Sequence, residues 1–319
     1  MKKLVITAGG FAKADPQLLS ELAQAGYEVQ NLSGRFQPNS PGDELIGALQ
    51  GARSVIAGRE SYSRRVLSAL PELRLISRCG VGCDSIDLEA CRELGITVCR
   101  GVGSVEGAVA EQVMAYILFF ARRLDLQSSM MHGGIWKKVL SRGAKGSTLG
   151  LVGFGGIGRE IALRAKPFGM KILYFCRHPD PRWDEAYGAS YAPLQEVIAR
   201  SDYLSVNTPL TSETRGMFGA KEFAAMKQGA IFINIARGPV ADARALAAAL
   251  RSGHLGGAGI DVYDSEPCTD SPLRECENAV LTPHTSTFTG ETRLLMARAA
   301  AQNVLDWERG ALSPRARAA

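Results

Sequence analysis

Residues 148–177 constrain the fold of this chain more than any other stretch. An apolar run over residues 149–152 is followed by glycines spaced as G-x-G-x-x-G, by helix-forming residues 159–166 and by a second apolar run over residues 171–175. This order predicts a strand, a glycine turn, a helix and a strand within about 30 residues, an arrangement typical of dinucleotide binding. An ordinary tight turn is the alternative, and the flanking strand and helix disfavour it. The expected cofactor loop comprises Gly153, Phe154, Gly155, Gly156, Ile157 and Gly158.

Each of the three spaced glycines of this motif has a separate physical task. Gly153 allows the tight turn, Gly155 leaves room for a pyrophosphate against the backbone, and Gly158 lets the helix pack closely on the sheet. The helix then presents its free N–H groups and the positive end of its dipole to the phosphates.

The composition limits the class of protein. With 319 residues, 46% of them hydrophobic and 22% charged, the chain is long enough for two globular domains. A net charge of +5, scattered along the chain, argues against a nucleic-acid partner. The longest apolar run, residues 113–121, is too short to span a membrane, and the N-terminal apolar run is too short for a signal peptide.

The cysteines predict a compartment. Seven is an odd number, and none of them has metal-ligand spacing with the histidines. We therefore expect reduced thiols in the cytoplasm, no disulfide framework and no metal site. Cys79 and Cys83 are interpreted as structural.

The first hundred residues alternate short apolar runs with amphipathic stretches. Helix starts are indicated by Asp15 followed by Pro16, and by Ser63. The alternation of strands and helices predicts a small parallel sheet with its own core. The expected strands are residues 4–8, 29–32, 54–57, 73–77 and 96–99.

The centre of the chain carries two glycine-rich breaks. Residues 78–84 contain two closely spaced glycines after a strand, which suits either an anion-binding loop or a simple loop. Residues 101–104 are interpreted as a hinge, and the helix expected over residues 105–124 is apolar almost all round. Such a helix is buried between layers or between subunits. A polar segment with Trp136 follows it.

In the second half of the chain, apolar runs end in residues that are able to do chemistry. Arg237 follows the run 231–235, Glu266 follows the run 258–262, and His284 follows the run 279–281. Taken singly, each residue has an explanation without function: Arg237 as a surface charge, Glu266 as a loop carboxylate and His284 as a turn histidine. Because the carboxyl ends of parallel strands meet at one edge, where ligands bind in doubly wound sheets, we expect them in one crevice. Cys176 and Arg177 follow the run 171–175 at that edge, and Thr208 and Pro209 follow the run 203–206.

Several long motifs in this order resemble the D-2-hydroxyacid dehydrogenase family, the relatives of phosphoglycerate dehydrogenase and glyoxylate/hydroxypyruvate reductase. They are SRCGVGCDSIDLEACRELGITV, LGLVGFGGIGREIA, TPLTSETRGMF, MKQGAIFINIARGPVADARAL, GAGIDVYDSEP and AVLTPHTSTFTGET. The resemblance implies two doubly wound α/β domains. Residues 1–100 and 287–319 would form a flavodoxin-like substrate domain, closed by a returning helix over residues 288–309, and residues 101–286 a Rossmann-type nucleotide domain.

The resemblance also implies the site. Arg237, Glu266 and His284 would form the catalytic set, with the N–H groups of Val81 and Gly82 on the substrate carboxylate. A proton donor that titrates near neutral pH suits the reduction of a 2-oxo acid, and histidine does so. A carboxylate on its other ring nitrogen would favour imidazolium, and a permanently charged arginine would bind the substrate and polarise its carbonyl. The resemblance further places Ala236 at the cofactor and Asp261 at the carboxamide of the nicotinamide. It places the helix over residues 105–124 at a homodimer contact and Trp136 in the partner's substrate pocket.

The end of the second nucleotide-domain strand predicts the cofactor. An NAD-binding unit places an acid about 20 residues past the glycines, to hold both ribose hydroxyls. Cys176 lies 18 residues beyond Gly158, and no acid is there. Arg177, with His178 beside it, offers a cation to a 2′-phosphate, which favours NADPH. Alternatively, Arg177 stacks on the adenine, which allows NAD as well.

The sequence also departs from the family pattern. Arg100-Gly101-Val102 stands where the family has an asparagine followed by a proline, which changes the roof over the nicotinamide. The alternatives are D-3-phosphoglycerate dehydrogenase, which often has a regulatory domain for which this chain leaves no room, and a nucleotide-sensing corepressor. The formate dehydrogenase branch pairs its histidine with an amide, whereas Glu266 is acidic. The basic tail, residues 313–319, is predicted to be disordered.

Overall fold

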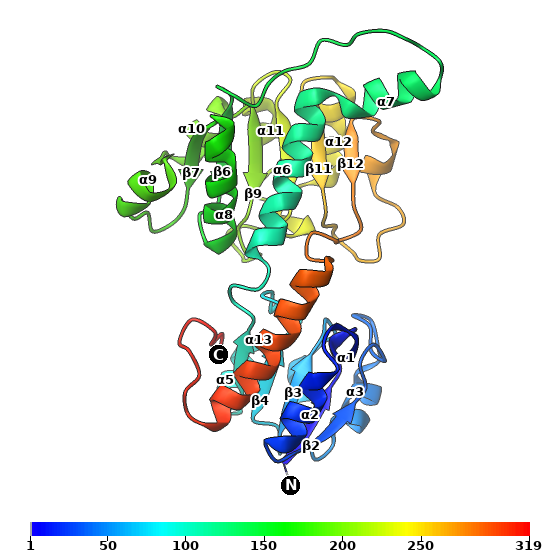
Figure 1. The fold of residues 1–319 in the computed structure, drawn as a ribbon, viewed down its shortest axis with the longest axis vertical. Helices are drawn as coiled ribbons and strands as arrows, with labels where there is room; N and C mark the ends of the chain where they lie inside the picture. The colour runs from blue at the N-terminus through cyan, green and yellow to red at the C-terminus, as the bar shows by residue number, and fades with distance from the viewer. Residues whose placement is uncertain (1) are drawn as a thin grey trace. The chain divides into compact units, whose positions relative to one another are not determined.

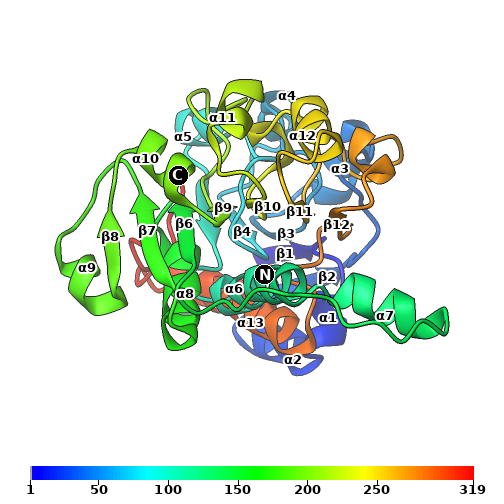
Figure 2. The same ribbon diagram turned by 90° about the horizontal axis from the view of Figure 1, so that it is seen from above.

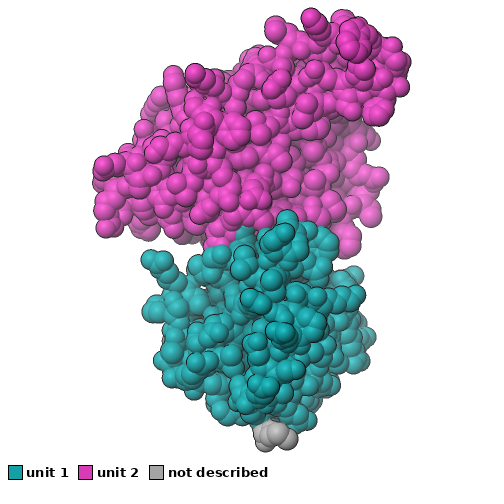
Figure 3. Space-filling model, in the orientation of Figure 1, with its two compact units in different colours: residues 1–105, 287–319 teal, residues 106–286 magenta. Residues whose placement is uncertain are grey.

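A computed structural model describes residues 2–319 and divides the chain into two compact units (Figures 1 and 3). Unit 1 comprises Met1–Val105 and Thr287–Ala319, and unit 2 comprises Glu106–Ser286. Each unit is built on one parallel sheet with helices on both faces. The predicted fold class, two doubly wound α/β domains, is therefore confirmed.

The sheet of unit 1 has the strand order β2-β1-β3-β4-β5, the flavodoxin-like arrangement. Successive residues of β1 face opposite sides: Leu4 and Ile6 pack with α2 and α13, whereas Val5 packs with α3, α4 and α5. The strands are β1 Lys2–Ile6, β2 Tyr27–Asn31, β3 Ser54–Ala57, β4 Leu75–Arg78 and β5 Thr97–Arg100. The helices are α1 Phe11–Ala14, α2 Gln17–Gln24, α3 Gly42–Leu49, α4 Arg64–Ser68, α5 Leu88–Glu93 and α13 Gly290–Glu308.

The C-terminal tail is ordered, so the prediction of disorder over residues 313–319 was wrong. The tail runs antiparallel beside β5, with Cys99 opposite Arg317. The N–H of Arg100 donates to the carbonyl of Ala316 at 2.9 Å, and the N–H of Ala318 donates to the carbonyl of Val98 at 2.7 Å. Backbone pairing with an open sheet edge does not depend on side-chain composition. The basic, small-residue composition of the tail therefore gave no indication of this pairing.

The sheet of unit 2 has the order β12-β11-β10-β9-β6-β7-β8, which extends the Rossmann arrangement by one strand. The strands are β6 Thr148–Val152, β7 Lys171–Phe175, β8 Ala189–Tyr191, β9 Tyr203–Val206, β10 Ile231–Asn234, β11 Gly257–Ile260 and β12 Ala279–Leu281. The helices are α6 Glu106–Arg122, α7 Leu124–His132, α8 Gly156–Ala165, α9 Arg182–Tyr187, α10 Leu194–Arg200, α11 Ala220–Ala225 and α12 Ala243–Arg251. Three short 3-10 helices are η1 Lys166–Phe168, η2 Gly238–Val240 and η3 Pro272–Glu275.

One face of helix α6 is buried within unit 2. The helix lies with α8 on one face of the sheet, and α10, α11 and α12 cover the other (Figure 2). Two glycines of β11 permit its close approach: a Cβ at Gly257 would lie 2.5 Å from the ring of Phe120, and one at Gly259 would lie 2.6 Å from the ring of Tyr116. Glycine at these positions therefore makes room for two aromatic side chains of the helix.

Two further observations concern the chain as a whole. All seven cysteines are free thiols. Among residues 2–319, no helix combines the length and the apolarity that crossing a bilayer requires.

Candidate active site

The glycine loop joins β6 to α8 and has three distinct glycine environments. Gly153 has a φ of 100°, and a Cβ there would lie 2.8 Å from the carbonyl of Asn207. A Cβ at Gly158 would lie 2.4 Å from the carbonyl oxygen of Gly153, so the helix is packed against the turn. A Cβ at Gly155 meets nothing within 4 Å, which leaves this side of the loop open.

Helix α8 begins at Gly156, three residues before the helix-forming run that starts at Arg159. Gly155 is the N-cap, and the first intrahelical hydrogen bond runs from the N–H of Arg159 to its carbonyl, at 3.0 Å. The N–H groups of Gly156, Ile157 and Gly158 precede that bond and have no intrahelical acceptor.

The open loop suits a dinucleotide. Unpaired N–H groups at a helix N-terminus bind phosphate oxygens, and the open space at Gly155 lets a pyrophosphate reach them. In addition, the buried hydroxyl of Thr208, which follows β9 next to the loop, has no hydrogen-bond partner among residues 2–319. A buried polar atom of this kind requires a partner, and a bound nucleotide offers one. Exposed Pro209 follows Thr208.

Phe154 differs from its neighbours because its side chain is buried. It is 1% exposed and stacks on Tyr174 with ring centroids 4.0 Å apart. Trp183 of α9 lies 5.7 Å from the same ring, and the guanidinium of Arg159 lies over Trp183 at 5.2 Å. This aromatic cluster packs around the Phe154 side chain and holds the loop in place. Only the backbone of Phe154 can therefore contact a cofactor.

The loop after β7 carries Cys176, Arg177 and His178. Cys176 is half-buried, and burial raises the pKa of its thiol against the opposing effects of the His178 N–H and the Arg159 charge. Arg177 and His178 are exposed. The nearest acid along the chain, Asp180, is held by the guanidinium of Arg182 at 2.6 Å. No carboxylate thus occupies the position at which NAD-specific units bind the ribose.

The loop after β10 carries Ala236 and Arg237. Asn234 holds it: its side chain accepts from the N–H of Ala236 and donates to the carbonyl of Arg237, both at 3.0 Å. The guanidinium of Arg237 donates to the carbonyl of Ala236 at 2.6 Å. The next residue, Gly238, touches the loop after β11, because a Cβ there would lie 2.0 Å from the carbonyl carbon of Tyr263. The loops that carry Arg237 and Glu266 therefore lie in contact.

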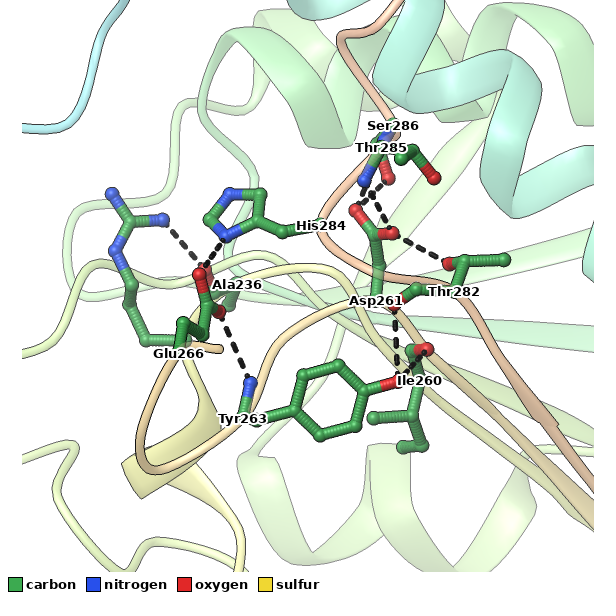
Figure 4. Close-up of polar contacts among 10 residues, drawn as sticks. Ala236, Ile260, Asp261, Tyr263, Glu266, Thr282, His284, Thr285 and Ser286 are labelled. Atoms are coloured by element: carbon green, nitrogen blue, oxygen red, sulfur yellow. Dashed lines mark hydrogen bonds and ion pairs between the residues drawn. The ribbon is translucent and has the colours of Figure 1, made fainter. Parts of the chain in front are cut away.

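The structure brings Glu266 and His284 together (Figure 4). Nδ1 of His284 lies 2.7 Å from Oε2 of Glu266, and Oε1 of Glu266 accepts from the N–H of Tyr263 at 3.2 Å. The side chains are 29% and 21% exposed, respectively. Because Nδ1 faces the carboxylate, Nε2 lies on the side of the ring away from Glu266.

Asp261 is buried behind this pair. It is 1% exposed, and its oxygens accept from the N–H groups of Thr285 and Ser286, at 2.8 and 3.0 Å, and from the hydroxyls of Thr282 and Ser286. Figure 4 shows all three partners around the carboxylate. Asp261 thus ties the end of β11 to the loop that carries His284.

Several residues of this network were missed by sequence reasoning. Tyr116 of α6 lies 2.5 Å from the hydroxyl of Thr282, and burial raises the pKa of Tyr116 to about 12. Asn234, Thr282 and Ser286 also escaped notice, although each lies within two or three residues of a predicted site residue. Such supporting residues can be found in a sequence as polar residues next to the strand ends that carry site residues.

In unit 1, Val81 and Gly82 follow β4 and are half-buried. Their N–H groups donate to no acceptor within residues 2–319. At the same edge of the sheet, buried Glu60 accepts from the N–H of Gly58 and the hydroxyl of Tyr62, both at 2.9 Å, and from the hydroxyl of Thr7. This carboxylate connects the loops after β1 and β3.

Trp136 is not part of the edge that carries His284. It follows α7 and is 85% exposed. Other large apolar side chains of the same segment are exposed as well: Leu124, Met131, Ile135 and Leu140.

A Rossmann-type unit whose glycine loop and histidine–glutamate pair lie at the same strand edge is the arrangement of a nucleotide-dependent dehydrogenase. The family model for the D-isomer specific 2-hydroxyacid dehydrogenase, NAD binding domain, matches residues 114–286, and the chain belongs to this family. The glyoxylate reductase of Thermococcus litoralis is 39% identical over 264 residues, which cover 80% of this chain and 80% of the relative.

Solved structures agree with this membership. A glyoxylate reductase from Paecilomyes thermophila matches with a TM-score of 0.88 and 29% identity, covering 99% of this chain and 98% of the other. A D-lactate dehydrogenase from Aquifex aeolicus, complexed with NAD and lactic acid, matches with a TM-score of 0.83 and 27% identity, covering 97% and 96% of the two chains.

Proposed function

We propose that this protein is an NAD(P)H-dependent reductase of small 2-oxo acids, of the glyoxylate/hydroxypyruvate type. The observation that carries the proposal is the contact between His284 and Glu266 at the strand edge next to Arg237. The relatives named glyoxylate reductase support the substrate class.

His284 is the proton donor of this proposal. Reduction adds a hydride to the carbonyl carbon and a proton to the carbonyl oxygen, and Nε2 of His284 delivers the proton. Glu266 on Nδ1 favours the imidazolium and holds the ring in one orientation. In the reverse direction, the same nitrogen accepts the proton of the hydroxyl group.

Arg237 binds the substrate. Its planar guanidinium matches a carboxylate and polarises a neighbouring carbonyl oxygen, so it stabilises the negative charge that develops there. We assign unit 1 the role of substrate domain, in which the N–H groups of Val81 and Gly82 receive the substrate carboxylate. Their lack of acceptors within residues 2–319 supports this assignment.

The dinucleotide binds to unit 2. The N–H groups of Gly156, Ile157 and Gly158 and the hydroxyl of Thr208 hold its phosphates and ribose, and a bound nicotinamide supplies the hydride. Ala236 and Pro209 line the same edge. We place Asp261 on the carboxamide side of the nicotinamide. It acts there through the loop over residues 282–286, which its carboxylate holds by hydrogen bonds.

NADPH is the preferred cofactor in this proposal. Neutral Cys176 stands where an acid would repel a 2′-phosphate, and Arg177 and His178 are exposed beside it. The alternative is that Arg177 stacks on the adenine, in which case NADH serves equally well.

The exposed apolar segment after α6 supports a homodimer. Side chains such as Trp136 at 85% and Met131 at 53% exposure require a partner surface, and oligomers of identical chains are the commonest solution. In such a dimer, Trp136 limits the size of the substrate in the neighbouring subunit. Seven free thiols support the cytoplasm as the compartment.

A panel assay tests the function. Oxidation of NADPH and of NADH is followed with glyoxylate, hydroxypyruvate, pyruvate and 3-phosphohydroxypyruvate. The proposal predicts the highest kcat/KM with glyoxylate or hydroxypyruvate. A preference for the phosphorylated acid would favour phosphoglycerate dehydrogenase activity, and cofactor binding without turnover of any acid would favour a nucleotide-sensing role.

A further inference from the structure

A cavity lies at the edge of unit 2 where the strands begin. Its volume is about 410 Å³, within the range of small-molecule sites. Ser147, Asp202 and Gly256, which line it, directly precede β6, β9 and β11, whereas Arg237 and His284 follow strand ends. Because the sheet is parallel, this cavity and the candidate active site lie at opposite edges.

The walls of this cavity come from both ends of the exposed segment. Arg123 lies where α6 passes into α7, and Leu140, Arg142 and Gly143 lie where the chain returns towards β6 (Figure 1). The N–H of Arg142 donates to the carbonyl of Ala121 at 2.9 Å, which fixes the returning end against the end of α6. The two arginines therefore face the same space from the two ends of one segment.

The charges that line the cavity do not balance. Asp202 is the only carboxylate among the lining residues, and it is neutralised: Nζ of Lys227 lies 2.9 Å from Oδ1, and the N–H of Thr148 donates to Oδ2 at 2.7 Å. Arg123 has a distant partner, Asp125, at 3.9 Å. The cavity therefore keeps a positive charge.

Arg142 contributes most of that charge. Its guanidinium forms no hydrogen bond or ion pair within residues 2–319. Arg142 and buried Tyr203 both line the cavity, and the charge of Arg142 opposes the rise in the pKa of Tyr203 that burial causes. An arginine that faces a polar cavity without a carboxylate has its full set of donors free for an anion.

The backbone conformation of Arg123 is a further sign that this cavity wall is constrained. Among residues 2–319, the non-glycine residues with positive φ are His284, at 54°, and Arg123, at 50°. Such a conformation costs about 1 to 3 kcal/mol in a non-glycine residue and persists where the surroundings impose it, often at functional sites. At Arg123 it turns the chain out of α6 and keeps the residue on the cavity wall.

We propose that this cavity is an anion-binding site for a small phosphate or carboxylate ligand, with Arg142 as the principal cation and Arg123 as the second. The bound anion joins the two ends of the segment over residues 123–142, whose positive charges otherwise repel each other. The proposal is independent of the reductase function, because no residue of the cavity belongs to the candidate active site.

Calorimetric titration with inorganic phosphate, and separately with succinate, tests the proposal at constant ionic strength. Arg142→Ala is expected to weaken binding of the preferred anion by about tenfold or more. Arg251→Ala is the matched control, because Arg251 is an exposed arginine of the same unit that does not line the cavity. It is expected to retain wild-type affinity. The anion that binds more tightly identifies the ligand class.

The glycine loop also attracts phosphate, so each titration is repeated with saturating NADPH. Anion binding that persists with the cofactor and is lost in Arg142→Ala supports the proposal. Slower hydrogen exchange over residues 123–142 with the anion supports it as well. Binding that NADPH abolishes, equal affinity in Arg142→Ala and wild type, or no binding of either anion would overturn it.

Discussion

Nδ1 of His284 lies 2.7 Å from Oε2 of Glu266, and the two residues follow different strands of the same sheet. His284 also has a positive φ of 54°, a conformation that its own sequence does not favour. The contacts of Asp261 with Thr285 and Ser286 hold the loop in which it occurs. The geometry of the pair therefore depends on the buried carboxylate of Asp261, which binds the backbone next to His284.

Replacing Glu266 by glutamine tests the role of the carboxylate. Reduction requires a proton from the His284 ring, so the form of the enzyme that has released this proton is inactive. An amide stabilises imidazolium less than a carboxylate does, so the alkaline limb of the kcat/KM profile should move to lower pH. Glu277→Gln, a change at an exposed acid, should leave the profile in place. An unmoved limb in Glu266→Gln would place the carboxylate outside the proton transfer.

Asp261→Asn tests the support of the His284 loop. Asparagine has one acceptor oxygen and places an NH₂ group against the donors of the loop, which leaves buried N–H groups unpaired. We expect a loss of about 1 to 3 kcal/mol in the free energy of unfolding and a fall in kcat of about tenfold or more. Urea denaturation and steady-state kinetics measure the two effects.

The control for this change is Asp264→Asn in the adjacent loop. The carboxylate of Asp264 accepts no hydrogen bond within residues 2–319, and burial together with the charge of Asp242 raises its pKa. A carboxyl group with a raised pKa is destabilised when charged, so this substitution should leave stability unchanged or slightly higher. Equal effects of the two substitutions would contradict a specific role for Asp261.

The sequence predicts the architecture of this protein well because strand and helix periods are local properties. The boundaries of β3, β7, β9 and β12 agree with the predicted runs, residues 54–57, 171–175, 203–206 and 279–281. Parallel topology then places all strand ends at one edge, so the neighbourhood of Arg237, Glu266 and His284 follows from the fold class alone.

Other features depend on contacts between distant residues, which a local pattern does not contain. Helix α7 was not predicted, because its apolar residues have no partner within the chain that would give them a periodic pattern. The pairing of the tail with β5 joins residues more than two hundred positions apart. The hydrogen bond between Tyr116 and Thr282 depends in turn on Gly259, whose missing side chain admits the helix.

Deletion of residues 313–319 tests the pairing of the tail. It removes four backbone hydrogen bonds to β5: the two above, one from the N–H of Val98 to the carbonyl of Ala319, and one from the N–H of Ala319 to the carbonyl of Val98. We expect the free energy of unfolding to fall by about 2 to 4 kcal/mol, and the exposed strand edge to promote aggregation, as seen by light scattering. Arg315→Ala alters an exposed side chain but keeps the strand, and should change neither property. A deletion variant as stable as wild type would show that the pairing contributes nothing.

Cofactor preference is tested by combining Cys176→Asp with Arg177→Ala. The new carboxylate repels a 2′-phosphate and binds the free ribose hydroxyls of NADH, so the ratio of kcat/KM for NADPH over NADH should fall by about tenfold or more. A wild-type preference for NADH would contradict the assignment of NADPH. A double variant that keeps its NADPH preference would show that the specificity lies elsewhere.

The most direct measurement is the turnover of His284→Ala with NADPH and glyoxylate, beside the NADPH dissociation constant from fluorescence titration. His254→Ala is the matched control, because His254 contacts Gln228 and the carbonyl of Phe223, away from the strand ends that carry the site. The proposed function predicts that kcat falls by about 10² or more in His284→Ala while cofactor affinity stays at the wild-type value, and that His254→Ala retains turnover. Near-normal turnover in His284→Ala would contradict the assignment of His284 as the proton donor.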